Sequence, residues 1–131
     1  MIELYNLGLN NNDINTMLEI CPTIKDLTND EILTNIKILK SINCNDRHIK
    51  NIIISNPMYL NRLSDDIIFL INKLKQLNIS NINLLFDTNP FLLNKDAYEI
   101  DEYINFEIKK GKELEDIIDE FESNPYIIDE I

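Results

Sequence analysis

Six carboxylates near the C-terminal end are the residues whose number and spacing most clearly suggest a chemical role. Clustered negative charge attracts a basic partner and steers its approach, so the cluster is a candidate docking patch. A second interpretation is a solvated outer face that keeps a terminal repeat in solution, and acids near the start of a helix also favour its dipole. The candidate residues are Glu113, Glu115, Asp116, Asp119, Glu120 and Glu122.

No catalytic or metal-binding pattern accompanies these acids. His48 is the one histidine, and the sequence suggests no nucleophile that it could activate. Cys21 and Cys44 lack the spacing of metal ligands and are expected to be reduced, buried side chains. With 2 Gly in the sequence, a glycine-rich phosphate loop is excluded. We therefore expect a protein that is not an enzyme and that needs no metal and no cofactor.

The charge is distributed unevenly along the chain. The formal net charge is −11, and residues 96–131 hold 13 acids against 3 bases, whereas residues 1–95 are nearly neutral. Nucleic-acid-binding domains normally show a basic stripe, so this balance disfavours nucleic acid and favours a protein partner with a basic surface. The N-terminal residues follow neither a secretory nor a transit-peptide pattern, and the longest apolar run is Ile67 to Ile71. The expected location is therefore cytoplasmic, without a membrane partner.

The elements that must position these residues follow from a repeated isoleucine–proline spacing. An isoleucine precedes each proline by eight residues, and successive isoleucines are 35, 33 and 35 residues apart. An isoleucine followed by apolar residues three and four places later predicts a short helix, which the proline ends. An apolar residue two or three places after each proline indicates a tight helical turn. The pairs are Ile14 and Pro22, Ile49 and Pro57, Ile82 and Pro90, and Ile117 and Pro125, and the turn residues are Ile24, Leu60, Leu92 and Ile127.

Polar residues mark where each helix should begin. Capping residues of the short helices are expected at 12–13, 45–46, 80–81 and 115–116. Longer helices should follow the first three turns, because Thr28 with Glu31 and Asp96 with Glu99 have the spacing of capping boxes. Ser64 or Asp65 should serve as the cap in the second repeat.

These patterns predict an all-α fold, a small helical-repeat solenoid of about four repeats in a single domain covering residues 1–131. The predicted repeats are residues 7–41, 42–76, 77–110 and 111–131. Each is a short helix, a one-turn helix and a longer helix, and such units bury their apolar faces by stacking. The last repeat is atypical, because Glu120 occupies a position that is apolar in the other three. A polar residue there predicts an exposed outer face, so the last repeat should be an acidic cap.

The motifs resemble those of a known family. The string Leu-Gly-Leu-x4-Ile-x2-Met-Leu-x2-Cys-Pro-x-Ile at Leu7 to Ile24, with Asn-Pro-x2-Leu at Asn56 and Asn89, resembles the mitochondrial transcription termination factor repeat over nearly the whole chain. The resemblance implies a curved solenoid with a basic concave groove that holds nucleic acid. Lysines near the C-terminal ends of the long helices would line that groove, although cations there also complement the helix dipole. They are Lys37, Lys40, Lys73, Lys75, Lys109 and Lys112.

Three functions are compatible with the sequence. The favoured one is a protein-interaction module that docks its partner through the acidic last repeat. The second is the nucleic-acid binding that the resemblance implies, which requires the six lysines to line one groove. The third is a small acidic inhibitor that mimics nucleic acid locally, since the acids cluster at one end instead of spreading over an extended surface.

Overall fold

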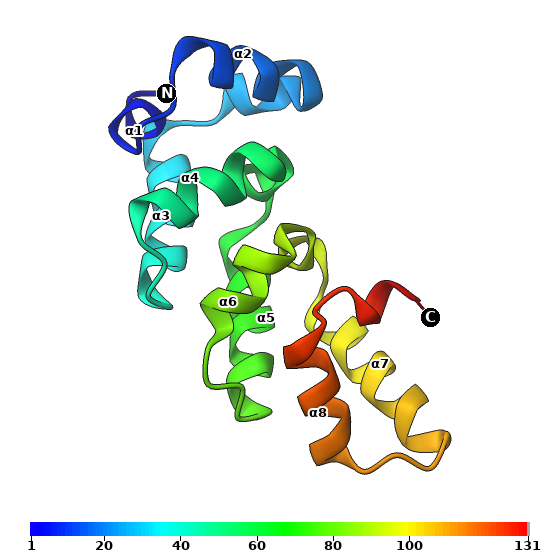
Figure 1. Cartoon of the computed structure of the whole chain (residues 1–131). Coiled ribbons are helices and arrows are strands. Elements are labelled where there is room, and N and C mark those ends of the chain that lie inside the picture. Colours follow the sequence, from blue (N-terminus) through cyan, green and yellow to red (C-terminus); the bar gives the residue numbers. More distant parts are fainter. Residues whose placement is uncertain (131) are drawn as a thin grey trace. The chain divides into compact units, whose positions relative to one another are not determined.

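The computed structural model describes residues 1–130, and this part of the chain contains helices and no strands (Figure 1). The predicted all-α repeat architecture is therefore confirmed. Residue 131, the last of the fourth predicted repeat, lies outside the described residues. The elements in chain order are α1 (Ile2–Asn6), α2 (Asn11–Ile20), η1 (Pro22–Asp26), α3 (Asn29–Ser41), α4 (Asp46–Ser55), η2 (Pro57–Asn61), α5 (Ser64–Gln76), α6 (Ile82–Thr88), η3 (Pro90–Asn94), α7 (Ala97–Lys109), α8 (Leu114–Ser123) and η4 (Ile127–Glu130), where η denotes a 3-10 helix.

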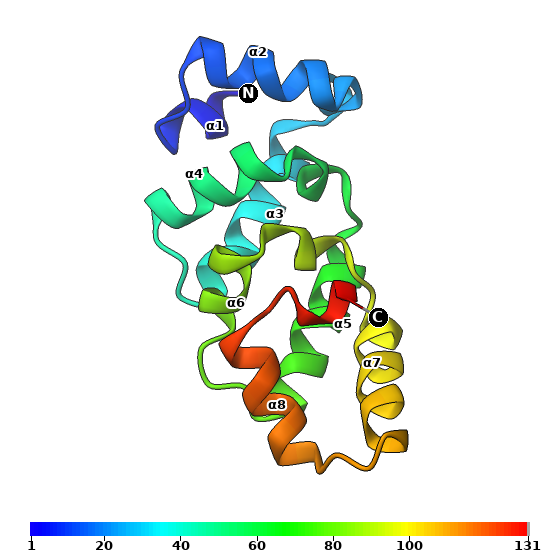
Figure 2. The same cartoon turned by 45° about the vertical axis from the view of Figure 1, so that its right-hand side comes forward.

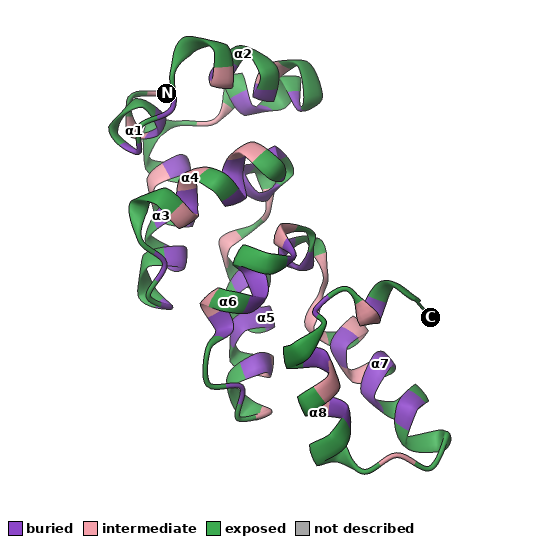
Figure 3. Cartoon of the chain, viewed as in Figure 1, coloured by how far each residue is buried: buried purple, intermediate pink, exposed green. Residues whose placement is uncertain are grey.

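The isoleucine–proline spacing defines the core of every repeat. The four isoleucines eight residues before a proline are all buried, as is the first isoleucine of each long helix, at Ile32, Ile67 and Ile100 (Figure 3). Proline is the first residue of η1, η2 and η3, where its missing N–H leaves no bond unmade. In the last repeat, Ile128 is buried and the predicted Ile127 is only half-buried, because Pro125 precedes η4 by two residues.

The chain forms two compact units, Met1–Ser64 and a second one beginning at Asp65. The prediction that all four repeats stack into one solenoid domain stays a prediction. Inside the first unit, α3 packs against both α4 and η2, and η1 packs against η2, so two successive repeats do stack there. Inside the second unit, α7 and α8 pack side by side, and η4 packs on α8 (Figure 2).

Asn35 fastens the long helix of the first repeat to the turn of the second. This buried amide donates to the carbonyl oxygens of Tyr59, Leu60 and Arg62 at 3.3, 3.3 and 3.0 Å. Its Oδ1 accepts a hydrogen bond of 2.9 Å from the hydroxyl of Ser64. Ser64 is the first residue of α5 and does not cap it as predicted; its hydroxyl bonds to Asn35 instead.

The turn of the fourth repeat is fastened to the third repeat in a related way. The buried Asn89 donates through Nδ2 to the carbonyl oxygen of Pro125 at 3.3 Å. The hydroxyl of Tyr126 donates to the carbonyl oxygen of Thr88 at 2.9 Å. The two residues before Pro90 therefore bond to Pro125 and Tyr126, which holds the segment that leads into η4 within the second unit.

Helix capping agrees with the sequence in part. Both capping boxes of the long helices are present, at Thr28 with Glu31 and at Asp96 with Glu99. Asn45 caps α4 and Asn81 precedes α6, as predicted. The caps of the first and last short helices lie two residues earlier than predicted, at Asn10 and Glu113. The first cap was misplaced because Asp13, one of the residues predicted as the cap, is instead the third residue of a capping box with Asn10.

A residue with positive φ ends each long helix and α1. The four φ angles are 100°, 70°, 61° and 94°, at Gly8, Asn43, Asn78 and Gly111. The following residue donates its backbone N–H to the carbonyl oxygen five residues earlier, from Leu9 to Leu4 in the first case and from Lys112 to Glu107 in the last. This Schellman geometry favours glycine and tolerates asparagine, which explains the residue types at these junctions.

Substitution at Gly111 should therefore cost backbone strain alone. A Cβ atom added there meets no other atom within 4 Å, so Gly111→Ala has no steric penalty beyond its φ of 94°. We expect it to lower the free energy of unfolding by about 1 kcal/mol, measured by urea denaturation. Asn43→Gly at an equivalent junction should have the opposite sign. Equal effects of the two variants would contradict the left-handed assignment.

Candidate partner-binding site in the last repeat

Helix α8 presents most of the predicted acidic residues to solvent. Ile117 and Phe121 form its buried face, and Phe121 packs against Tyr103 of α7 with ring centroids 5.8 Å apart. Glu113 is the N-cap residue of the helix. Four of the remaining five acids are exposed, and Glu120 is half-buried; the exposed ones are Glu115, Asp116, Asp119 and Glu122.

Three of these acids line a groove on the second unit. The groove has a volume of about 330 Å³ and lies between α8 and the turn that follows α5. Glu115, Asp119 and Glu122 are spaced four and three residues apart, so they share one face of α8. The other lining residues are mainly apolar: Leu77, Asn78, Leu114 and Ile118. Glu113, Asp116 and Glu120 are not part of this groove lining, so the structure separates the predicted acids into two groups of three.

Glu120 belongs to an ion-pair cluster that we call the polar triad, formed by Glu107, Lys112 and Glu120. The amine of Lys112 lies 3.0 Å from the Glu107 carboxylate and 2.9 Å from that of Glu120. The Glu107 side chain is 6% exposed and that of Glu120 is 43% exposed. Glu120 is thus half-buried with its charge compensated by Lys112, and the exposed outer face inferred from this residue stays a prediction.

The polar triad replaces three apolar positions of the other repeats. Counted from the left-handed junction residues, Glu107 corresponds to Leu4, Leu39 and Leu74. Lys112 corresponds by the same count to Leu9, Cys44 and Ile79, and Glu120 to Met17, Ile52 and Leu85 when counted from the prolines. All nine of these apolar residues are buried. Three charged replacements that meet in one cluster compensate one another's charge, which explains how the repeat tolerates them.

Charge compensation shifts the ionisation of this cluster. The hydrogen bond from Lys112 holds the pKa of Glu107 below its ordinary value, against the opposing effect of burial. The hydrogen bonds to Glu120 and Glu107 raise the pKa of Lys112. Burial raises the pKa of the neighbouring Tyr103, and the negative charge of Glu107 adds to this effect. Both members of the Glu107–Lys112 pair are therefore charged at neutral pH.

The lowered pKa of Glu107 makes stability depend on pH on the acid side. A carboxyl group that ionises more readily when folded stabilises the protein above its unfolded pKa, and this contribution is lost as the pH falls through the folded pKa. We compare the wild-type protein with a variant without the triad, Glu107→Leu with Lys112→Ile and Glu120→Leu. The melting temperature of the wild-type protein should fall more steeply below about pH 4.3 than that of the variant. Thermal unfolding followed by circular dichroism between about pH 3 and 7 measures this. Parallel curves for the two proteins would contradict it.

The six lysines of the predicted nucleic-acid groove fall into two classes. Three are engaged on the protein: Lys40 lies 3.7 Å from Asp46, Lys73 lies 3.0 Å from Asp101, and Lys112 belongs to the triad. The other three are exposed and form no ion pair within residues 1–130; they are Lys37, Lys75 and Lys109. Lys37 and Lys40 lie in the first unit, and the other four lie in the second.

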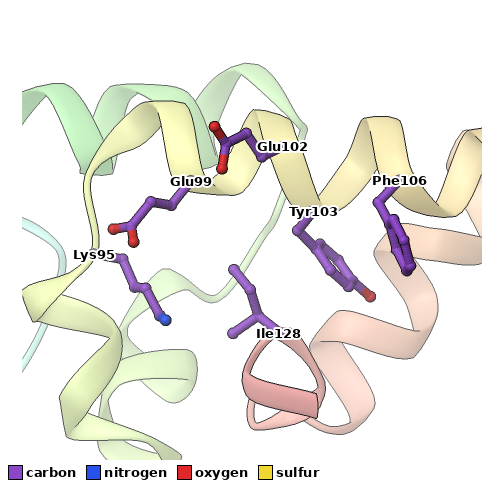
Figure 4. Close-up of a pocket in the computed structure, with 6 residues that line it drawn as sticks. All are labelled: Lys95, Glu99, Glu102, Tyr103, Phe106 and Ile128. Carbon is purple, nitrogen blue, oxygen red and sulfur yellow. The ribbon is translucent and has the colours of Figure 1, made fainter. Parts of the chain in front are cut away.

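A second cavity, of about 320 Å³, lies between α7 and η4 (Figure 4). Tyr103 points its hydroxyl along α7 toward Phe106, away from Lys95. The amine of Lys95 is 2.9 Å from Asp129, and Glu99 accepts a hydrogen bond from the backbone of Asp96. Lys95 and Glu99 therefore have structural partners, whereas the buried Tyr103 hydroxyl has no hydrogen-bond partner among residues 1–130. None of the residues that line the cavity is a nucleophile paired with a base.

The remaining predicted candidates have structural positions. His48 is half-buried in the first turn of α4, where its backbone N–H donates to the capping Asn45. Both cysteines are buried and unbridged, as expected, and Cys21 receives a hydrogen bond from Asn61 at 2.8 Å. Within the described residues, no group of three metal-ligating side chains could hold an ion. No helix among them has both the length and the apolarity needed to cross a membrane.

Comparison with known proteins found no matching family model, no similar curated protein and no similar solved structure. The resemblance to the mitochondrial transcription termination factor repeat stays a prediction. The groove beside α8 and the charges around it are therefore the features of the protein that point to a function.

Proposed function

We propose that this protein is a non-enzymatic binding module that docks a basic protein partner through its acidic last repeat. The groove beside α8 supports this function best, because three carboxylates line it and none forms an ion pair within residues 1–130. Unpaired carboxylates on one face of a helix create a local negative potential that steers a cationic surface toward the groove. The net charge of −11 adds to this potential.

Charge neutralisation in the groove tests this function. The probe is a labelled helical peptide of lysine and leucine, and its binding is followed by fluorescence anisotropy. The combined variant Glu115→Gln, Asp119→Asn and Glu122→Gln should weaken binding about tenfold, because each exposed pair contributes a fraction of 1 kcal/mol. The matched control, Glu19→Gln, Asp26→Asn and Asp87→Asn, changes the net charge equally at exposed sites that do not line the groove. Equal weakening by both variants would show that only net charge matters and would reject the docking site.

Nucleic-acid binding is the second candidate function. The observation that favours it is the exposure of Lys37, Lys75 and Lys109 near the C-terminal ends of α3, α5 and α7. Each phosphate neutralised by a lysine would add to a steep salt dependence of binding. The engaged state of Lys40, Lys73 and Lys112 counts against it, since three of the six cations already have carboxylate partners. An inhibitor that presents the acids of α8 as a local nucleic-acid decoy is the remaining alternative.

A further inference from the structure

In the first unit, one of the protein's own lysines lies beside the junction that corresponds to the groove beside α8. Lys50 of α4 lies seven residues before its proline, as Ile118 of α8 does. A Cβ atom added to Gly8, the left-handed junction residue, would lie 3.9 Å from Cδ of Lys50. The aliphatic stem of Lys50 therefore lies over this junction, as lysine stems do on apolar surfaces.

In the second unit, the side chain at the position of Lys50 is shorter than lysine and does not extend as far over the junction. Ile118 takes the position of Lys50, and Asn78 is the corresponding junction residue. Ile118, Leu77 and Asn78 line the open groove of about 330 Å³. Leu114 lies one turn before Ile118 and is 47% exposed. Leu114 and Ile118 form an apolar stripe that the core of the repeat does not require, because Ile117 and Phe121 already form the buried face of α8.

The outer positions of α8 are also distinctive in charge. The residues that correspond to Ile118 in the other repeats are all polar: Asn15, Lys50 and Asn83. The acids Glu115 and Asp119 correspond to Arg47 and Asn51 of α4, counted from the prolines. Compared with α4, helix α8 therefore lacks the lysine side chain and has an apolar side chain in its place. It also carries acidic residues where α4 has Arg47 and Asn51.

From this comparison we propose that the groove binds a basic segment of a partner protein, with a lysine or arginine stem on Leu77 and Ile118 and its charge among Glu115, Asp119 and Glu122. The partner's side chain takes the place that Lys50 occupies in the first unit. This inference rests on the proposed function and adds to it where the partner's basic side chain lies and which apolar residues it contacts. A segment with apolar residues beside its basic ones fits best, because Leu114 offers exposed apolar surface at the end of the groove.

The variant Ile118→Lys tests the groove directly. It places in α8 the residue type that α4 carries at this position, so the fold should accept it, as an unchanged melting temperature would show. Its own stem should then cover the groove and weaken binding of the lysine–leucine peptide by at least about tenfold. Ser123→Lys is the charge-matched control, since it adds the same charge at an exposed position of α8 outside the groove lining, and it should weaken binding less than about threefold.

A peptide in which serine replaces every leucine should bind the wild-type protein at least about tenfold more weakly, because it keeps the charge and loses the apolar contact. Equal effects of Ile118→Lys and Ser123→Lys, or equal affinities of the two peptides, would overturn the groove inference. The proposed function would survive that result if neutralisation of Glu115, Asp119 and Glu122 still weakened binding more than its control. If neutralisation also failed, both proposals would fall.

Discussion

Replacing Asn35 with alanine should lower the free energy of unfolding by about 3 kcal/mol, because the change leaves buried polar groups without partners. Three carbonyl oxygens, those of Tyr59, Leu60 and Arg62, lose the amide donor, and the Ser64 hydroxyl loses its acceptor. Urea denaturation followed by circular dichroism measures the loss.

Asn72→Ala provides the matched control, since this asparagine lies on the exposed side of α5 and should change stability by less than about 0.5 kcal/mol. Leucine at position 35 should not restore stability, although the equivalent residue of the next repeat is Leu70, because a leucine cannot donate to the carbonyls of η2. An Asn35→Ala protein as stable as the control would contradict the fastening role of this side chain.

Replacing Glu107 with alanine should lower the melting temperature by about 5 °C, because the partly exposed Lys112 amine then keeps only the more exposed Glu120 as its partner in the triad. Replacing all three members of the polar triad with the residue types of the other repeats removes every charge together. The variant Glu107→Leu with Lys112→Ile and Glu120→Leu should therefore melt within a few degrees of the wild-type protein or above it.

Comparison of Glu107→Ala with the triple variant separates the effect of leaving a charge without its partner from the effect of any substitution at these positions. Their difference in melting temperature by differential scanning calorimetry is the quantity to measure. If the triple variant were as unstable as Glu107→Ala, the charges would not be simple replacements of the apolar core. The correspondence between the repeats would then be wrong at these three positions.

The repeat itself could be predicted from the sequence because its signal is a fixed spacing between residues of strong local effect. Isoleucine marks the buried face of each short helix, and proline ends the helix and begins the turn. Neither effect depends on distant parts of the chain. The same holds for the capping box of Thr28 and Glu31, whose two members lie within one helical turn.

Interactions between distant residues could not be predicted in this way. Considered alone, Glu120 predicts an exposed face. Its carboxylate, however, pairs with Lys112, and Lys112 also pairs with Glu107 of α7, which the local sequence does not show. Asn43 and Asn78 are two of many asparagines in the sequence, and only the backbone geometry shows that they adopt positive φ. The misplaced cap at Ser64 has the same cause, since its acceptor Asn35 is 29 residues away.

The candidate site was predicted as a set of six acids, and the structure divides that set. Periodicity alone places Glu115, Asp119 and Glu122 on one face of a helix, so their grouping was accessible from the sequence. The groove was not accessible, because Leu77 and Asn78 lie far from α8 in the chain. A comparison of Ile118 with Lys50 across the aligned repeats is the signal that could have pointed to it.

The most direct test of the proposed function is one set of anisotropy titrations of the unmodified protein at about 50 and 200 mM salt. The labelled probes are the lysine–leucine peptide, duplex DNA and single-stranded RNA. An acidic docking module should bind the peptide at the lower salt and bind neither nucleic acid. Tight binding of DNA or RNA that weakens steeply with salt, without binding of the peptide, would contradict the proposed function and favour a nucleic-acid-binding repeat protein.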